Sequence, residues 1–507
     1  MLSSTALAES NYDIVITNGR VIDPESQLDA IRNVGIRGKV IETISTKPLK
    51  GNRIIDAKGL IVSPGFIDIH SHSFELPGQR MQAFDGVTTA LELESGVLPV
   101  SEWYELQKTE GRVLNYGTSA SWTFARISSM VAEKNQMQAT AEWYLDSFKY
   151  PQWQSQQSSE QELKNMLTVL EQGIKEGALA IGVNAGYVPG VGGKELIEVS
   201  KLAARYGIPT STHIRNWSNV DPDSSLEGLN MMIGLAATTG VESIICHLNS
   251  SMLRDAKVAI EMLEAARNKG ISITTEAYPY GMGSFPISAA ILRLPGDDFR
   301  SRIGTDWDSV SLIATGRQIV DEADIRKEQK SDPGQMVVLE YLNEDKAEDL
   351  KILDQSIASR WIPIASDAVP WSMPDGSMLK GDIWPLPKEA ASNPRSAGTF
   401  TKFLGEYVRE RKVLSWMEAL RKISLLPAQT LENGVPAMKR KGRLQEGMDA
   451  DITIFDPKTI ADRATVENSA QTSIGIRYLL VNGTPLIIDN KLDVKVRPGH
   501  AIRRDIK

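Results

Sequence analysis

The chain has 507 residues, with 56 lysines and arginines against 64 aspartates and glutamates, and a formal net charge of −8. This length predicts one large domain with an accessory module rather than one compact core. The acidic balance and the lack of a basic stripe argue against nucleic acid as a partner, because its phosphates would be repelled. The single cysteine, Cys246, excludes an internal disulfide framework and a cysteine-rich zinc module.

The two ends of the chain share a strand-rich texture. Residues 12–62 contain turns at Asn18-Gly19 and Asp23-Pro24 and little helical periodicity, and the same texture returns from residue 442 to 488. Neither end has enough strands for a stable fold by itself. We therefore expect residues 1–62 and 436–507 to pair into one small β-sandwich.

The first ten residues bear on the compartment. MLSSTALAES contains an Ala-Leu-Ala that resembles a signal-peptidase site, but it lacks the apolar core of a working signal. We interpret it as the remnant of a trimmed leader, which leaves both a cytoplasmic and a periplasmic location open. No apolar stretch approaches the ~20 residues that would span a membrane, so no membrane partner is expected.

Between the ends, short apolar runs alternate with helical patterns such as residues 160–176, 194–205 and 254–269. This alternation predicts an α/β fold, a (β/α)8 barrel of the TIM type over residues 63–435. The interval between the seventh and eighth strands is too long for an ordinary connection and predicts an insertion at about residues 285–360. The eight expected strands are residues 63–70, 88–94, 114–120, 178–183, 208–213, 243–247, 271–276 and 362–367.

Four of the five histidines lie at the ends of these strands. His70 and His72 follow the first strand in GFIDIHSH, and His213 and His247 end the fifth and sixth. Parallel barrel strands bring their carboxyl ends to one rim, so these imidazoles should converge. Zinc prefers such nitrogen ligands, combined with carboxylate oxygen. The sequence therefore predicts a centre for one or two Zn²⁺ ions. Cys246, one residue before His247, should point to the opposite face and act as a small buried hydrophobe.

Two acidic side chains of the second strand are candidate metal ligands. Glu92 and Glu94 in GVTTALELESG lie on one face of that strand, and burying them requires cationic compensation. Glu94 is nearer the carboxyl end, so we expect it to be the ligand and the bridge of a dinuclear site, with Glu92 as the alternative. The fourth strand, ALAIGV, offers no lysine for carbamylation.

Asp367 ends the eighth expected strand, WIPIASD, and two roles are open to it. It can bind metal, and it can accept a proton from a water that the metal activates and pass it to the leaving group. We therefore assign Asp367 as both ligand and general base.

These motifs together resemble the amidohydrolase superfamily, and more closely its N-acyl-D-amino-acid deacylase (D-aminoacylase) branch. The resemblance is carried by PGFIDIHSH, THIRN, EAYPY, NPRSAGTFTKFLGEYV and GRLQEGMDADITIFDP, and it covers nearly the whole chain. It implies a zinc-dependent barrel that removes N-acyl groups from D-amino acids. It also implies that Tyr278, Ser284 and Arg395 bind the substrate, with Arg395 holding its carboxylate.

The chain departs from the branch at three positions. The branch has a cysteine ligand in a GNCG turn where this chain has LELESG, a lysine where Asn249 stands, and a histidine where Asn393 stands. A metal bridge in this chain would therefore be a carboxylate rather than a thiolate.

The sequence predicts a metal-dependent amidohydrolase whose substrate is a small molecule carrying an amide and a carboxylate. Hydrolysis of a cyclic amide or dipeptide, and deamination of a heterocycle, are alternatives on the same site. Metal binding without catalysis is disfavoured, because metal storage would not require a base at Asp367. The oligomeric state, the acyl group and the substrate side chain remain open.

Overall fold

The centre of the molecule is a sheet of seven parallel strands, seen in the computed structural model, which describes residues 11–506. The proposed leader remnant at residues 1–10 lies outside the described part. The expected α/β barrel is confirmed, and its strands follow one another in the sheet in chain order. They are β6 (Phe66–Asp68), β7 (Val87–Val97), β8 (Asn115–Ser121), β9 (Ile181–Asn184), β10 (Thr210–His213), β11 (Ser243–Ile245) and β12 (Ile273–Thr275).

An extended segment at residues 362–368 closes the barrel in place of a regular eighth strand. It forms isolated parallel bridges on both sides, Ala277 with Ile364 and Ser71 with Ala368. The Asp367 amide donates to the His70 carbonyl (2.8 Å), and the His72 amide donates to the Ala368 carbonyl (2.7 Å). The segment thus lies where the expected strand should lie, and it carries Asp367 to the end of β6.

Helices cover the outside of the barrel. Those at the expected positions are α6 (Glu160–Lys175), α7 (Gly193–Tyr206) and α10 (Ala256–Asn268), and α8 (Ser225–Thr239) is a further one. In α6, Ser159 and Glu162 form a capping box, and Met166, Leu170 and Ile174 are buried on one face at helical spacing. The apolar stripe of this helix therefore packs inward against the sheet.

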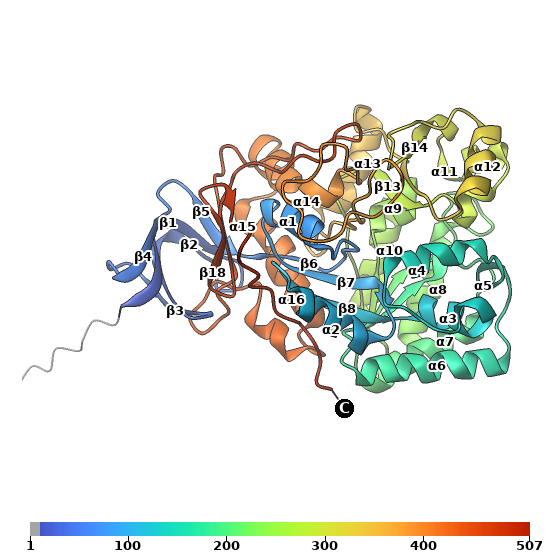
Figure 1. Ribbon diagram of the computed structural model, residues 1–507, viewed down its shortest axis with the longest axis horizontal. Helices are drawn as coiled ribbons and strands as arrows, with labels where there is room; N and C mark the ends of the chain where they lie inside the picture. Colours follow the sequence, from blue (N-terminus) through green and yellow to red (C-terminus); the bar gives the residue numbers. More distant parts are fainter. Residues whose placement is uncertain (1–10, 507) are drawn as a thin grey trace, which may run out of the picture.

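Both ends of the chain join one sheet beside the barrel (Figure 1). The contact between the ends is the antiparallel pair β5 (Ile61–Pro64) and β16 (Ile452–Phe455), with Val62 opposite Ile454. Buried side chains of these strands form a hydrophobic cluster separate from the barrel core. The other members are β1 (Tyr12–Asp23), β2 (Leu28–Arg37), β3 (Val40–Ser45), β4 (Gly51–Asp56), β17 (Ile476–Val481), β18 (Thr484–Ile488) and β19 (Lys491–Leu492).

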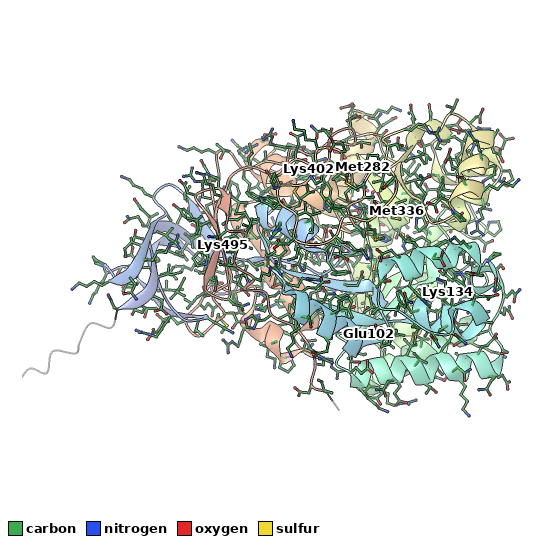
Figure 2. The ribbon with its side chains drawn as sticks, in the orientation of Figure 1. Glu102, Lys134, Met282, Met336, Lys402 and Lys495 are labelled. Atoms are coloured by element: carbon green, nitrogen blue, oxygen red, sulfur yellow. The ribbon has the colours of Figure 1, made fainter. Side chains whose placement is uncertain are left out.

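After β12 the chain forms a second, smaller sheet before it returns to the barrel. Its antiparallel strands are β13 (Met282–Pro286), β14 (Val310–Leu312) and β15 (Met336–Glu340), in the order β13-β15-β14. Met282 and Met336 pack against a small apolar cluster of Ile313, Val338 and Val369, and both methionines are labelled in Figure 2. The sheet therefore packs against residues that directly follow Asp367. No helix within residues 11–506 has the length and apolarity needed to cross a membrane.

Candidate metal centre

Six expected ligand side chains meet at the carboxyl ends of the barrel strands. His70 and His72 follow β6, Glu94 lies in β7, His213 ends β10 and His247 follows β11, while Asp367 comes from the closing segment. The geometry divides them into two groups with donor atoms close together, His70–His72–Asp367 and Glu94–His213–His247.

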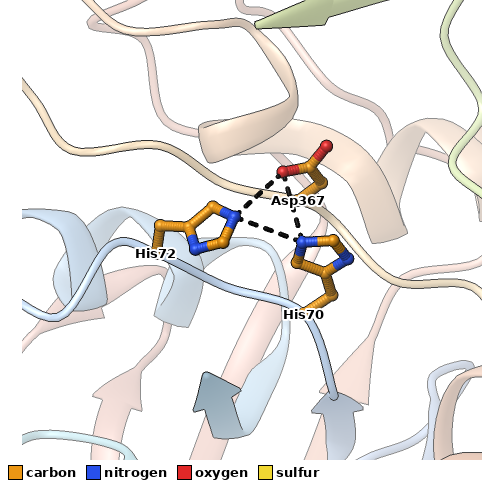
Figure 3. A group of neighbouring side chains, drawn as sticks. All are labelled: His70, His72 and Asp367. Atoms are coloured by element: carbon orange, nitrogen blue, oxygen red, sulfur yellow. Dashed lines mark hydrogen bonds and ion pairs between the residues drawn. The ribbon is translucent and has the colours of Figure 1, made fainter. Parts of the chain in front are cut away.

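The first group has the spacing of a coordination shell (Figure 3). The Nε2 atoms of His70 and His72 are 3.2 Å apart, and Asp367 Oδ1 lies 3.4 and 3.3 Å from them. Ligand atoms at ~2.0–2.2 Å from a tetrahedral zinc ion are separated by about these distances. The three side chains thus leave a position between them that suits one small divalent ion.

Glu94 connects the first group to the second. Its Oε1 lies 3.0 Å from His213 Nδ1 and 2.9 Å from His247 Nε2, while its Oε2 lies 3.4 Å from Nε2 of both His70 and His72. One carboxylate therefore presents one oxygen to each pair of histidines, which is the arrangement a bridging ligand requires.

Three of the imidazoles are oriented by a partner on their outer nitrogen. Glu276 contacts Nδ1 of His70 (2.7 Å), Glu92 contacts Nδ1 of His72 (2.6 Å), and Ser251 Oγ lies 2.9 Å from Nδ1 of His247. A carboxylate that accepts the Nδ1–H leaves Nε2 unprotonated and directed inward, as metal-binding histidines require. Glu92 thus lies behind His72, whereas Glu94 lies between the histidines.

The residues present fit a divalent metal. Three Nε2 atoms, His213 Nδ1, and the oxygens of Glu94 and Asp367 face one another in a buried site. Buried donor atoms of this kind at such separations repel one another unless a proton or a metal cation lies among them. The nitrogen and oxygen donors also match the preference of zinc, and Glu94 makes the donor set suitable for two ions.

The pKa values of the two acidic ligands favour their ionised forms. Burial by itself raises the pKa of Glu94, but the charge of His70 and hydrogen bonds from His213 and His247 outweigh it and hold the pKa well below the ordinary value. Burial likewise opposes ionisation of Asp367, yet the Arg395 guanidinium and His70 lower its pKa. Both groups are carboxylates at neutral pH, so Asp367 can accept a proton.

Two supporting residues are not evident from the sequence. The Asn184 side chain, at the end of β9, donates to Glu94 Oε2 (3.1 Å), and Thr123 Oγ1 donates to Asn184 Oδ1 (3.0 Å). Asp68 is buried and accepts the backbone amides of His70 (3.2 Å) and Ser366 (3.0 Å), so it ties the end of β6 to the closing segment. Burial raises the pKa of Asp68 to about 6. In the sequence, only position could have indicated Asn184 and Asp68, because each stands where a barrel strand ends.

The Cys246 side chain lies on the same face as the metal centre, not on the opposite one. It is buried, its Sγ is 3.3 Å from Ser211 Oγ, and it lies within 4.8 Å of donor atoms of His70 and Glu276. Strand alternation predicted the opposite face. Regular pairing ends at Ile245, and His247 has φ of 35°, so alternation no longer describes this stretch.

The expected substrate residues lie close to Asp367. The Arg395 guanidinium is buried, donates from Nε to the Asp367 carbonyl (2.8 Å), lies 2.9 Å from Asp367 Oδ2 and is 4.7 Å from the Tyr278 ring centre. The Tyr278 hydroxyl is buried and has no hydrogen-bond partner among the described residues. Asn393 donates to Ser284 Oγ (2.7 Å).

Gly283 separates Arg395 from the space above the metal centre. A Cβ at Gly283 would lie 3.4 Å from the Tyr278 hydroxyl and 3.9 Å from Arg395 Nη1. Gly283 lines the cavity and Arg395 does not, so the guanidinium lies behind this glycine. Asn249, by contrast, donates to the carbonyls of Tyr278 (3.0 Å) and Tyr280 (3.1 Å), so its amide is used within the protein.

A cavity of about 710 Å³ opens over the centre. His72, Glu94, His213, His247 and Asp367 lie at its base, and Tyr278, Gly283 and Ser284 line its wall. The ligand groups and the expected substrate residues therefore face a space large enough for a small organic molecule.

Comparison with known proteins shows which ones this chain is similar to. The chain matches the model of the Amidohydrolase family over residues 53–141 and 382–487. It is 25% identical over 519 residues to the N-acyl-D-glutamate deacylase of Alcaligenes xylosoxydans xylosoxydans, covering 98% of each chain. It is 24% identical over 492 residues to the D-aminoacylase of the same organism, covering 94% of each.

Solved structures show the same fold. The N-acyl-D-glutamate deacylase of Bordetella bronchiseptica, complexed with zinc and a phosphonate inhibitor, superposes with a TM-score of 0.75 at 22% identity. A D-aminoacylase structure superposes with a TM-score of 0.75 at 20% identity, and each comparison covers 97% of this chain and 100% of the other. The predicted resemblance to the amidohydrolase superfamily, and to its N-acyl-D-amino-acid deacylase branch, is confirmed. The chain is thus similar to amidohydrolases over nearly its whole length, and its donor set fits a metal centre of the kind such enzymes use.

Proposed function

We propose that the protein hydrolyses the amide bond of N-acyl-D-amino acids. The observation that carries this proposal is the shared carboxylate of Glu94 between two histidine pairs, with Asp367 beside them at the base of the cavity. His70, His72, Glu94, His213, His247 and Asp367 would hold one or two zinc ions. A bound divalent ion would supply the Lewis acidity that activates water and polarises the amide carbonyl.

Asp367 is the proposed base. Its carboxylate takes a proton from the attacking water and delivers it to the amide nitrogen as the C–N bond breaks, which releases a carboxylic acid and a free amine. Arg395 lies against Asp367 Oδ2 and keeps the carboxylate ionised and oriented before the substrate binds.

The cavity wall that Tyr278, Gly283 and Ser284 line suits an N-acyl amino acid. The Tyr278 hydroxyl has no hydrogen-bond partner among the described residues, and Arg395 Nη1 lies next to Gly283 of the cavity lining, so the two side chains are the proposed site for the substrate carboxylate. A guanidinium binds a carboxylate through parallel hydrogen bonds, which also orients the amide. Ser284 contributes a hydroxyl beside them.

Cyclic amides are the second candidate substrates. The dihydroorotase of Streptococcus pyogenes serotype M1 is 39% identical, but over 19% of this chain only, and a D-hydantoinase from Thermus sp. superposes with a TM-score of 0.56. These likenesses are weaker than those to the deacylases.

The test is a substrate panel. Zinc-loaded protein is incubated with N-acetyl and N-succinyl derivatives of D- and L-amino acids, with hydantoin and dihydroorotate as cyclic amides, and release of amine or ring opening is measured. We expect turnover of the D-acyl compounds. Turnover of the cyclic amides alone would contradict the proposal.

A further inference from the structure

Three aromatic side chains of the cavity lining, Tyr187, Trp217 and Phe285, are together called the aromatic wall. The Tyr187 ring centre lies 4.7 Å from that of His213, so the wall begins at the metal centre. Trp217 and Phe285 meet edge to face at 5.0 Å, and Trp217 Nε1 donates to the Ser250 carbonyl, which holds the indole in place. All three residues line the cavity.

The cationic side chains that line the cavity already have partners. Within residues 11–506 they are three, Arg112, Lys149 and Lys380. Arg112 Nη2 pairs with Glu110 (2.7 Å), Lys149 pairs with Asp146 (2.5 Å), and Lys380 pairs with Glu142. Outside the metal centre the lining carboxylates outnumber these cations, since they are Glu75, Glu110, Glu142, Asp146 and Asp332.

This distribution of charge leaves one cation for one substrate carboxylate. Arg395 lies next to Gly283 of the cavity lining and is assigned above to the α-carboxylate. A second carboxylate on the substrate would meet an acidic surface and lose its water without gaining a partner.

We propose that the substrate's amino-acid side chain is apolar, either aromatic or large and aliphatic, and that it packs against the aromatic wall. This inference rests on the proposed function, because it names the side chain of the N-acyl-D-amino acid. Tyr187, Trp217 and Phe285 can bury such a side chain, whereas the lysines and the arginine of the described cavity lining already pair with carboxylates.

The first test compares substrates. With zinc-loaded protein, kcat/KM for N-acetyl-D-phenylalanine and N-acetyl-D-leucine should exceed that for N-acetyl-D-glutamate and N-acetyl-D-aspartate by at least ~10-fold. The free amino acids are reaction products, and D-phenylalanine should inhibit the enzyme more strongly than D-glutamate does. This product inhibition measures binding independently of turnover. Faster cleavage of the acidic substrates would overturn this inference and leave the deacylase function standing. Failure to cleave any N-acyl-D-amino acid would overturn the proposed function itself.

The second test assigns the preference to the wall. Trp217→Ala should lower kcat/KM for N-acetyl-D-phenylalanine by about 10- to 100-fold and that for N-acetyl-D-alanine by less than ~3-fold. Phe285→Ala removes the other half of the pair without loss of a hydrogen bond and should act in the same direction. Trp361→Ala is the matched control, because Trp361 is half-buried, pairs with Glu264 and does not line the cavity. An equal loss with the alanine and phenylalanine substrates would contradict the role of the wall.

Discussion

Exchanging Glu94 for glutamine should remove metal far more effectively than the same exchange at Glu92. The two side chains make a matched pair, since they come from one strand, are two residues apart and are both buried. Glutamine keeps the shape and removes the charge. Glu94 faces four imidazole nitrogens, whereas Glu92 contacts only the outer nitrogen of His72 and the Ser95 amide.

The expected magnitudes follow from these contacts. A four-ligand zinc site binds with roughly 10–16 kcal/mol, so one ligand corresponds to about 3–4 kcal/mol, or ~10²- to 10³-fold in affinity. Because Glu94 is shared, Glu94→Gln should weaken both positions and lower the stoichiometry. Glu92→Gln loses only the orientation of His72, and such an outer contact is worth ~10- to 100-fold.

The metal content of the two variants tests this expected difference between Glu94 and Glu92. Both variants and the parent protein are loaded with zinc and dialysed against chelators of increasing strength, and the zinc that remains is quantified. Thermal unfolding of each metal-free protein checks that the two variants share a fold. Equal or greater metal loss in Glu92→Gln would refute the assignment of Glu94 as the bridge.

Three further predictions concern turnover, substrate binding and stability. Asp367→Asn should lower kcat by ~10²- to 10⁴-fold with the fold retained, measured beside zinc content, because an amide cannot take the proton. Gly283→Ala should raise KM for N-acyl-D-amino acids more than for their methyl esters, since the added methyl would lie 3.4 Å from the Tyr278 hydroxyl and 3.9 Å from Arg395 Nη1; an equal rise with both would contradict the carboxylate clamp. Lys422 is fully buried, and burial and then Arg421 lower its pKa to about 7. Above pH 7 the unfolded chain therefore binds more protons than the folded one, and stability should rise between pH 7 and 9 by about 2 kcal/mol from this group. Lys422→Met should raise the stability at pH 7 and abolish its increase between pH 7 and pH 9. Urea unfolding at pH 7 and at pH 9 would measure both effects.

The barrel could be predicted because its determinants are local. Buried parallel strands give continuous apolar runs, and the surrounding helices give runs of helical period, so α6, α7 and α10 lie within two residues of the expected ranges. The closing segment was expected as a regular strand because WIPIASD has the right composition. In the structure it pairs only at Ile364 and Ala368, and the buried carboxylate of Asp68 accepts its Ser366 amide in place of a strand partner.

The convergence of the four histidines could also be predicted, because each lies at or just after the end of a barrel strand. The partners that orient them could not. Glu276 reaches His70 and Asn184 reaches Glu94 across the barrel, over separations of 206 and 90 residues. No local pattern encodes such pairs, and a glutamate at a strand end is equally consistent with a ligand, an orienting carboxylate or a solvated side chain.

The choice between Glu92 and Glu94 shows where the argument from periodicity ends. Residues two apart in a strand share a face, so alternation identifies the pair but does not rank its members. In the structure the pairing of β7 with β8 is regular up to Glu92 and shifts between Glu92 and Val97. Glu94 lies within this irregular stretch, where it contacts Asn184 and both histidine pairs, while Glu92, at the last regular position, is directed at His72 Nδ1. A register shift thus assigns the two carboxylates different roles, and register depends on the neighbouring strand rather than on the sequence of β7 alone.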